Sequence, residues 1–106
     1  MSYRFMRMLV MFDLPTETLE DRRAYRRFRK TLIENGFSML QESVYSKLLI
    51  TPSAETTTLS AIQKEKPKSG IITSLVVTEK QFASMTYLVG EYHSEILDSD
   101  ERLVIM

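Results

Sequence analysis

The sequence predicts an α+β fold built on an antiparallel sheet, and three observations support this prediction. Two apolar runs, residues 8–12 and 71–78, are long enough for strands but carry no polar helical face. A helix-period pattern lies between them at residues 19–35. Residues 37–51 hold two apolar groups separated by a polar triplet, as expected for extended structure. We expect one domain over residues 1–106, because a chain of this length supports a single modest core.

The first strand is predicted from residues 8–12, a run of five apolar side chains that favours a central strand covered on both sides. Asp13 and Pro15 end the run. A charge inside such a strand is costly, so we expect Asp13 at its C-terminal end, where solvent or a ligand reaches it. Asp13 is therefore the first candidate for chemistry, and the alternative is that it caps the following turn.

A helix is predicted over residues 19–35. Thr18 and Asp21 have the spacing of a capping box at its start, and Gly36 is its expected C-terminal stop. At the helical period, four apolar or aromatic residues share an arc of about 100° that must face the sheet. They are Ala24, Tyr25, Phe28 and Leu32.

The opposite face of this helix is predicted to be basic. Residues 22–30 contain six basic residues and no acidic one, whereas the formal net charge of the chain is zero. A basic face on a neutral protein predicts non-sequence-specific binding to nucleic-acid phosphates, and arginine suits bidentate phosphate contacts. The alternative is a merely solvated helix face. The candidate nucleic-acid-binding residues are Arg22, Arg23, Arg26, Arg27, Arg29 and Lys30.

The middle of the chain predicts a hairpin and a second helix. Residues 37–51 form either two strands meeting at the polar triplet 41–43 or one long strand with a bulge, and we favour two strands. Pro52 and Ser53 predict the start of a second helix, which is expected to end before Pro67. Leu59 and Ile62 are its expected inward residues.

Residues 71–78 are apolar and β-branched and predict a second central strand. Thr78 and Gln81 have capping-box spacing, which predicts a short helical turn over residues 79–85. Further strands are expected at residues 86–89 and 103–106, and a polar loop with His93 joins them. The order βαββαβ is typical of the ferredoxin-like arrangement, an antiparallel sheet with both helices on one face. The last strand, residues 103–106, has no obvious place within its own four-stranded sheet, which suggests that it pairs with the edge of another subunit.

Composition excludes several classes of site. The chain has no cysteine and a single histidine, so thiolate chemistry and a multi-histidine zinc site within one chain are excluded. The segment from Asp98 to Glu101 lacks the glycine and distal glutamate of an EF-hand loop, so we expect a solvated turn there. No signal-peptide pattern or membrane-length apolar run occurs, which predicts a soluble cytoplasmic domain without membrane contact.

The motif residues also resemble a known family. The segments RMLVMFDLP at 7–15 and GFSMLQESVYSKLL at 36–49, with the arginine-rich helix between them, resemble the small CRISPR-associated endonuclease family, here called Cas-two. This family is the second core protein of spacer acquisition in CRISPR antiviral defence. The resemblance covers essentially the whole chain and is greatest to members from type II-A systems.

The resemblance implies a homodimer whose C-terminal strands, about 86–106, cross between subunits. It also implies that the two Asp13 carboxylates face each other and bind a divalent cation. Mg²⁺, or another divalent cation such as Mn²⁺, would relieve the repulsion between two such carboxylates. Many relatives have tyrosine before this aspartate, whereas this chain has Phe12, which lacks a hydroxyl. With Asp13 as both metal ligand and catalytic residue, the implied activity is slow metal-dependent cleavage of RNA or DNA.

Two other functions remain open. The first is an architectural dimer that binds and spans double-stranded spacer DNA between copies of the integrase partner Cas-one, without chemistry. The second is a regulatory ferredoxin-like module that binds a metabolite, which we disfavour because no glycine-rich ligand loop accompanies the basic helix.

Overall fold

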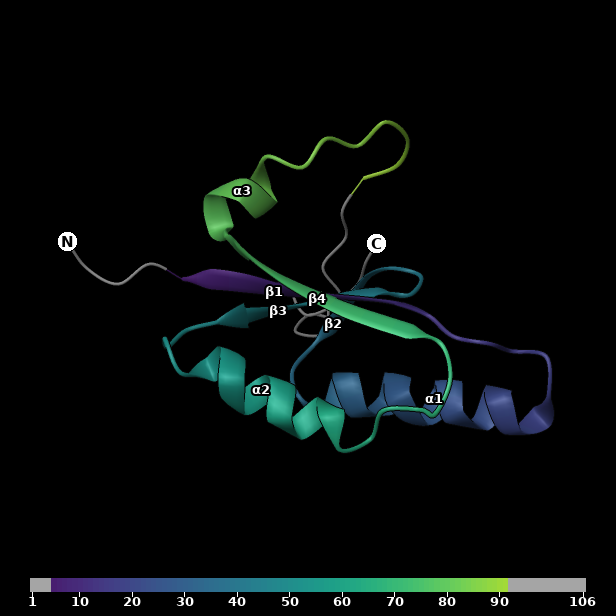
Figure 1. Ribbon diagram of the computed structural model, residues 1–106. Helices are drawn as coiled ribbons and strands as arrows, with labels where there is room; N and C mark the ends of the chain where they lie inside the picture. The colour runs from purple at the N-terminus through teal and green to yellow at the C-terminus, as the bar shows by residue number, and fades with distance from the viewer. Residues whose placement is uncertain (1–4, 92–106) are drawn as a thin grey trace, which may run out of the picture.

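The computed structural model describes residues 5–91, which form one four-stranded sheet with two helices beneath it in the view of Figure 1. Seven elements follow one another along the chain: β1 (Met6–Asp13), α1 (Leu19–Glu34), β2 (Ser38–Gln41), β3 (Val44–Leu49), α2 (Ala54–Gln63), β4 (Ile71–Thr78) and α3 (Glu79–Ala83).

The sheet has the strand order β2-β3-β1-β4, and each neighbouring pair is antiparallel. This order, with α1 and α2 on the same side of the sheet, confirms the α+β fold and the ferredoxin-like arrangement (Figure 1). β1 is central, as predicted. The prediction that 71–78 is a second central strand is wrong, because among the described residues β4 pairs with β1 alone and forms an edge. Its β-branched composition predicts a strand, but the order of strands is set by the chain connections.

α1 begins where the sequence predicts and ends one residue earlier, with Asn35 as its C-cap. The Asp21 amide donates to the Thr18 hydroxyl over 3.0 Å, and the Thr18 amide donates to the Asp21 carboxylate over 3.3 Å, which completes the capping box. The helix ends at Glu34, and Gly36 has a φ of +93°, a conformation that glycine adopts without strain.

The core lies between α1, α2 and the covered face of the sheet. Phe28 and Leu32 of α1 are buried in one cluster with Met8, Val10 and Phe12 of β1. The Phe28 ring meets the Phe12 ring edge-on, with centroids 5.4 Å apart. This packing fixes the end of β1, where Asp13 lies, against the middle of α1.

The segment 37–51 forms two strands joined by a tight turn, as favoured from the sequence. β2 and β3 are separated by Glu42 and Ser43, and the pairing also shifts register between Met39 and Gln41. The segment therefore contains both the favoured hairpin and a bulge-like shift in strand register. Ser43 has a φ of +66°, the single non-glycine residue with positive φ among those described.

α2 packs through Ile62, which is buried, and Leu59, which is partly buried against the core, as predicted. Thr58 is also buried, and its hydroxyl accepts a hydrogen bond from the Lys47 ammonium of β3 over 2.9 Å. This bond stabilises a polar residue within a helix whose three consecutive threonines have low helical propensity.

The chain after β4 departs from the prediction. The capping box of Thr78 and Gln81 is present, and α3 follows it as a short helix. Residues 86–89 do not form the predicted strand, and Leu88 and Val89 are both 92% exposed. An apolar composition favours extended structure but does not supply a neighbouring strand to pair with. The predicted strand 103–106, the loop of His93 and the turn 98–101 lie outside the described residues.

α3 lies on the other side of the sheet from α1 and α2 (Figure 1). Arg7 of β1 donates to both carboxylate oxygens of Glu79, over 2.7 and 3.1 Å, and its guanidinium lies 4.5 Å from the Phe82 ring centroid. Within residues 5–91, no helix is both long enough and apolar enough to cross a membrane.

Candidate active site

Asp13 is the last residue of β1 and its side chain is exposed, as predicted for a carboxylate at the end of a buried strand. Its neighbours Phe12 and Leu14 are both buried, so the backbone that carries the carboxylate is held on both sides. In the described part of the chain, no group donates a hydrogen bond to this carboxylate. Asp13 thus makes no turn-capping side-chain hydrogen bond within residues 5–91, and its side chain is exposed.

A shallow groove of about 400 Å³ opens beside Asp13, and we call it the Asp13 groove. It is bounded by the end of β1 with the following loop, by the first turns of α1, and by the β2–β3 turn. Its lining residues are Asp13, Leu14, Thr16, Arg22, Tyr25, Arg26, Glu42 and Ser43. The fold thus brings the candidate carboxylate together with two of the six candidate phosphate-binding residues.

The remaining basic residues lie outside this groove, and one of them has a different role. Arg23, Arg27 and Lys30 are exposed along α1. Arg29 is also exposed, but its Nε donates to the buried Tyr45 hydroxyl over 2.7 Å, so part of its guanidinium braces α1 against β3.

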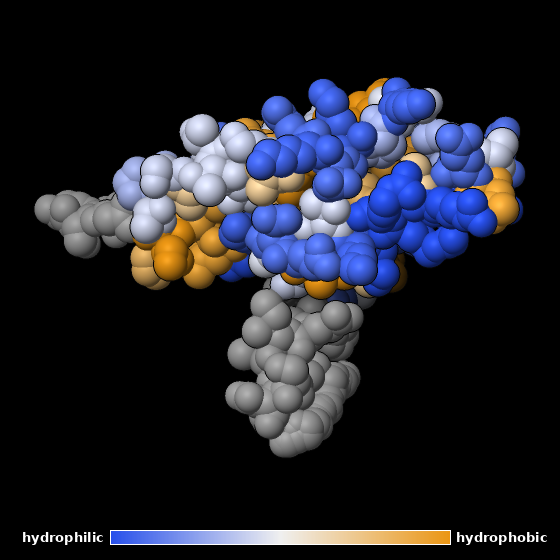
Figure 2. Space-filling model, turned by 90° about the horizontal axis from the view of Figure 1, so that it is seen from below, coloured by the Kyte–Doolittle hydropathy of each residue, from blue (hydrophilic) through white to orange (hydrophobic). Residues whose placement is uncertain are grey.

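The arginines of α1 have no carboxylate partner among residues 5–91; the ion pairs described there are Arg7 with Glu79 and a distant one between Lys30 and Glu34. Arg22 instead donates to the carbonyl oxygens of Thr16 and Glu17, both over 3.1 Å, which orders the β1–α1 loop. Figure 2 views the molecule from the helix side and shows strongly hydrophilic side chains over much of this face. Unpaired guanidinium groups gathered on one helix attract polyanions.

Four polar groove residues were not predicted as site residues from the sequence, namely Thr16, Tyr25, Glu42 and Ser43. Tyr25 was assigned only to the sheet-facing arc, yet its hydroxyl reaches the Ser43 hydroxyl at 3.3 Å. The helical spacing offered one clue, since residues three and four positions after Arg22 are its neighbours on the helix surface. Nothing local in the sequence places the β2–β3 turn next to them, because that contact spans 18 residues.

Comparison with known proteins identifies the family. The sequence profile described as "CRISPR associated protein Cas2" matches residues 6–85. A protein of Streptococcus mutans serotype c, named CRISPR-associated endoribonuclease Cas2, is 55% identical over 95% of this chain and 93% of its own length. A protein of the same name from Treponema denticola is 48% identical over 95% of this chain and its full length. The chain belongs to the Cas2 family.

A solved structure supports the same fold. The crystal structure of Streptococcus pyogenes Cas2 at pH 6.5 matches with a TM-score of 0.62 and 21% sequence identity, covering 78% of this chain and 99% of that one. At this identity the likeness shows the fold alone. It confirms that the ferredoxin-like order of the described residues is an architecture found in the Cas2 family.

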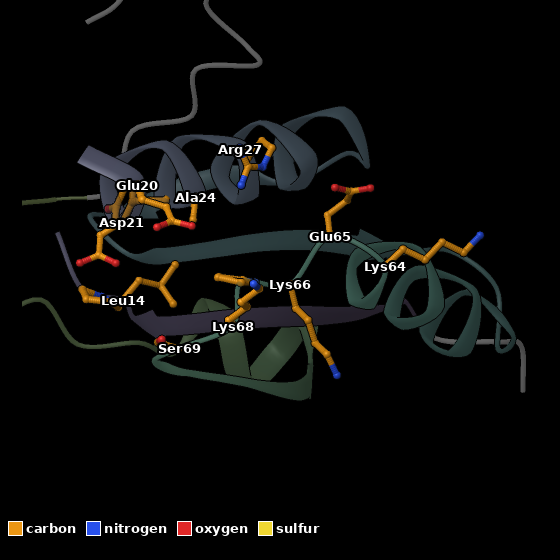
Figure 3. Close-up of a pocket in the computed structure, with 13 residues that line it drawn as sticks. Leu14, Glu20, Asp21, Ala24, Arg27, Lys64, Glu65, Lys66, Lys68 and Ser69 are labelled. Atoms are coloured by element: carbon orange, nitrogen blue, oxygen red, sulfur yellow. The ribbon is translucent and has the colours of Figure 1, made fainter. Parts of the chain in front are cut away.

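A second groove in this Cas2 family member lies between α1 and the α2–β4 connection, residues 64–69, which we call the lysine loop. Figure 3 shows Glu20, Asp21, Ala24 and Arg27 on the α1 side, and Lys64, Lys66 and Lys68 on the other. The groove has a volume of about 490 Å³ and mixed charge, since three acidic residues line it with four basic ones. These lysines were not predicted as site residues, although they alternate along the sequence Lys-Glu-Lys-Pro-Lys at residues 64–68.

The capacity of the site for a metal ion is limited to oxygen ligands. Within residues 5–91, no group of three or more histidine, cysteine, aspartate or glutamate side chains gathers into a metal site. The Asp13 groove offers two carboxylates, Asp13 and Glu42. Proteins hold Mg²⁺ with one or two carboxylates and leave several waters in place, so this donor set fits a hard divalent cation.

Proposed function

We propose that this Cas2 family member is a divalent-metal-dependent endonuclease that hydrolyses phosphodiester bonds in RNA, DNA or both, and that it takes part in CRISPR spacer acquisition. The observation that carries the proposal is that Asp13 lines one groove with Arg22 and Arg26, is exposed, and has no hydrogen bond to its carboxylate within residues 5–91. The endoribonuclease names of the relatives support RNA as a substrate.

The groove residues divide into two roles in this proposal. Asp13, with Glu42 nearby, would hold Mg²⁺ or Mn²⁺ through carboxylate oxygens. When bound, such an ion stabilises charge on a phosphoryl oxygen and makes water a better nucleophile near neutral pH. Arg26 and Arg22 would bind nonbridging phosphate oxygens, for which the guanidinium fork is suited. One chain supplies few ligands, which is consistent with a slow enzyme or with a site completed by Asp13 of a second copy.

Several features support a homodimer. Ile71 and Leu75 of β4 and Leu48 of β3 lie on the helix-free face of the sheet by their register with β1, and all three are exposed. Ile71 is also the register partner of Asp13, so an interface on this face would lie next to the carboxylate. Light scattering coupled to size-exclusion chromatography tests the proposal, and a monomer at micromolar concentration would contradict it.

The test of the enzymatic proposal is a charge-removing substitution with a matched control. Asp13→Asn should abolish cleavage of a labelled RNA or DNA in the presence of Mg²⁺, and EDTA should abolish wild-type cleavage. Glu55→Gln is the control, because Glu55 is an exposed carboxylate in the first turn of α2 and lines neither groove. Cleavage by Asp13→Asn at the wild-type rate would refute the proposal.

An architectural function is the second candidate, in which a dimer binds and spans DNA between copies of the integrase partner Cas-one. It is favoured by the position of Arg23, Arg27 and Lys30, which are exposed on α1 outside the Asp13 groove. A hydrolytic site alone does not need this additional basic surface. If Asp13→Asn supports spacer acquisition in cells as well as the wild type, cleavage is dispensable for acquisition and the architectural function is the required one.

A further inference from the structure

Two hydroxyl groups from distant parts of the chain meet in the Asp13 groove. The Tyr25 hydroxyl of α1 and the Ser43 hydroxyl of the β2–β3 turn are 3.3 Å apart, and both residues are half-buried. We call them the hydroxyl pair. Both residues line the groove together with Asp13, Arg22 and Arg26.

Each member of the pair is held in place independently of the other. The Ser43 carbonyl accepts a hydrogen bond from the Phe12 amide over 3.0 Å, which ties the turn to β1 immediately before Asp13. The Tyr25 ring contacts the Phe12 ring edge-on, with centroids 5.8 Å apart and planes at 68°. Phe12 therefore fixes both members, so their positions relative to Asp13 are set by the core.

The backbone of Ser43 has a φ of +66°, a conformation that is unfavourable for a residue with a side chain. Glycine would form the same turn without this cost. A neutral hydrogen bond as long as 3.3 Å adds little to the stability of the folded state. Stability alone thus gives little reason for serine at this position, and strained residues that persist cluster at functional sites.

The pair has unused hydrogen-bonding capacity. One hydroxyl donates to the other, so the accepting hydroxyl keeps its own proton for a third group. Among residues 5–91 no other hydrogen bond is made by either hydroxyl, and the groove into which they open also contains two guanidinium groups. A ligand that accepts hydrogen bonds from both arginines and a neutral hydroxyl needs several acceptor oxygens. A phosphodiester has such oxygens.

We propose that Tyr25, oriented by Ser43, donates a hydrogen bond to a nonbridging oxygen of the phosphodiester bound in the Asp13 groove. Tyr25 is then a substrate-contacting residue and Ser43 is a positioning residue that acts through it. The arginines supply charge, whereas the rigid hydroxyl fixes where the phosphate lies relative to the Asp13 carboxylate. Fixed donors of this kind raise the rate of reaction more than they raise affinity. The inference rests on the proposed function, because it concerns the same groove.

The experiment compares three single substitutions. Tyr25→Phe removes the phenolic hydroxyl and keeps the ring against Phe12. Ser43→Gly removes the serine hydroxyl and relieves the positive φ, so it cannot act by strain. Tyr87→Phe is the matched control, because Tyr87 is exposed and lines neither groove. For each variant, kcat and KM for Mg²⁺-dependent cleavage of a labelled RNA are measured, together with the thermal unfolding midpoint.

We expect kcat to fall about tenfold or more in Tyr25→Phe and Ser43→Gly, with KM changed by less than about threefold. Ser43→Gly should unfold at the wild-type temperature or above it, and Tyr87→Phe should match the wild type in every measurement. A kcat within about twofold of the wild type in both Tyr25→Phe and Ser43→Gly overturns the inference and leaves the proposed nuclease function intact.

A second measurement separates failure of the inference from failure of the proposed function. A short RNA with 2′-O-methyl groups, which resists cleavage, is titrated into ¹⁵N-labelled protein in EDTA. We expect the Ser43 amide resonance to shift in the wild type and to shift less than half as far in Tyr25→Phe. If the wild type cleaves neither RNA nor DNA, the nuclease proposal fails, and this titration decides the inference alone. Equal shifts in the wild type and in Tyr25→Phe, or no shift in either, then overturn it.

Discussion

Gly70 packs directly against the backbone of Asp13. A Cβ atom at Gly70 would lie 2.7 Å from the Asp13 carbonyl oxygen and 2.7 Å from a methyl carbon of Leu14, and the φ of Gly70 is +100°. The position of Gly70 directly precedes β4 and favours glycine for two reasons. Its φ is positive, and the neighbouring atoms leave no room for a Cβ. The position of the catalytic candidate depends on the absence of a side chain at a residue 57 positions further along the chain.

We therefore expect Gly70→Ala to destabilise the protein and to reduce cleavage. The control is Gly90→Ala, because Gly90 also has a positive φ, +85°, but an added Cβ there meets nothing within 4 Å. Gly90→Ala should cost about 1 kcal/mol or less of unfolding free energy, through φ alone. Gly70→Ala should cost about 2 kcal/mol more, because of the close contact. Urea denaturation of both variants measures the difference, and equal costs would contradict the importance of this contact.

The basic face of α1 predicts a salt-dependent affinity that differs between its residues. Arg27→Gln should weaken duplex DNA binding and reduce the slope of log K against log salt by about 0.9, the value for one phosphate contact. Arg29→Gln should change this slope less, because Arg29 already bonds to Tyr45. Lys80→Gln on α3, across the sheet from α1, is the control and should leave the slope unchanged. Fluorescence anisotropy at several salt concentrations measures the slopes, and identical slopes in all three variants would exclude α1 from the interface.

The Arg29–Tyr45 bond gives a prediction about stability. Tyr45→Phe should lower the free energy of unfolding by about 1–2 kcal/mol, because it removes a short bond of 2.7 Å to a charged donor and leaves the buried ring in place. A double-mutant cycle with Arg29→Gln isolates the coupling between the two side chains. If the losses of unfolding free energy in the two single variants add up to the loss in the double variant, the Arg29–Tyr45 bond does not measurably stabilise the packing of α1 on β3.

The two ion pairs of the described chain should differ in strength. Arg7 and Glu79 pair in a bidentate manner, their side chains are 19% and 38% exposed, and the Arg7 guanidinium lies over the Phe82 ring. A double-mutant cycle should therefore give a coupling of about 1 kcal/mol. Lys30 and Glu34 are 4.0 Å apart and 75% and 62% exposed. Their coupling should be about 0.3 kcal/mol. Thermal unfolding in low salt measures both cycles, and a stronger Lys30–Glu34 coupling would reverse this assignment.

Local patterns predicted most of the fold because they were consistent with one another. The Thr18–Asp21 and Thr78–Gln81 capping boxes set the starts of α1 and α3, and the apolar run of 8–12 predicted the central strand. The exposed Asp13 followed from the cost of burying a charge. These features depend on residues within a few positions of each other, which is the range that propensity and periodicity cover.

The features that could not be predicted from the sequence depend on contacts between residues far apart in the chain. The edge position of β4 depends on how the chain crosses the sheet, and residues 86–89 lack a neighbouring strand among the described residues. The approach of Tyr25 to Ser43, and of the lysine loop to Arg27, arises from tertiary packing between elements far apart in sequence. The sequence therefore predicted the carboxylate and the cations of the Asp13 groove, but not its hydroxyl groups.

The hydrogen bond from the Phe12 amide to the Ser43 carbonyl makes the two-residue β2–β3 turn an extension of the sheet. An added residue there would move Ser43 out of reach of Phe12, so the turn should reject insertions even though it lies at the surface. Residues 64–66 of the lysine loop are exposed and precede the tight contact of Gly70, so they are the better place for a fluorescent label or an affinity tag. Among related proteins, insertions and deletions are therefore expected in the lysine loop and not in the turn between β2 and β3.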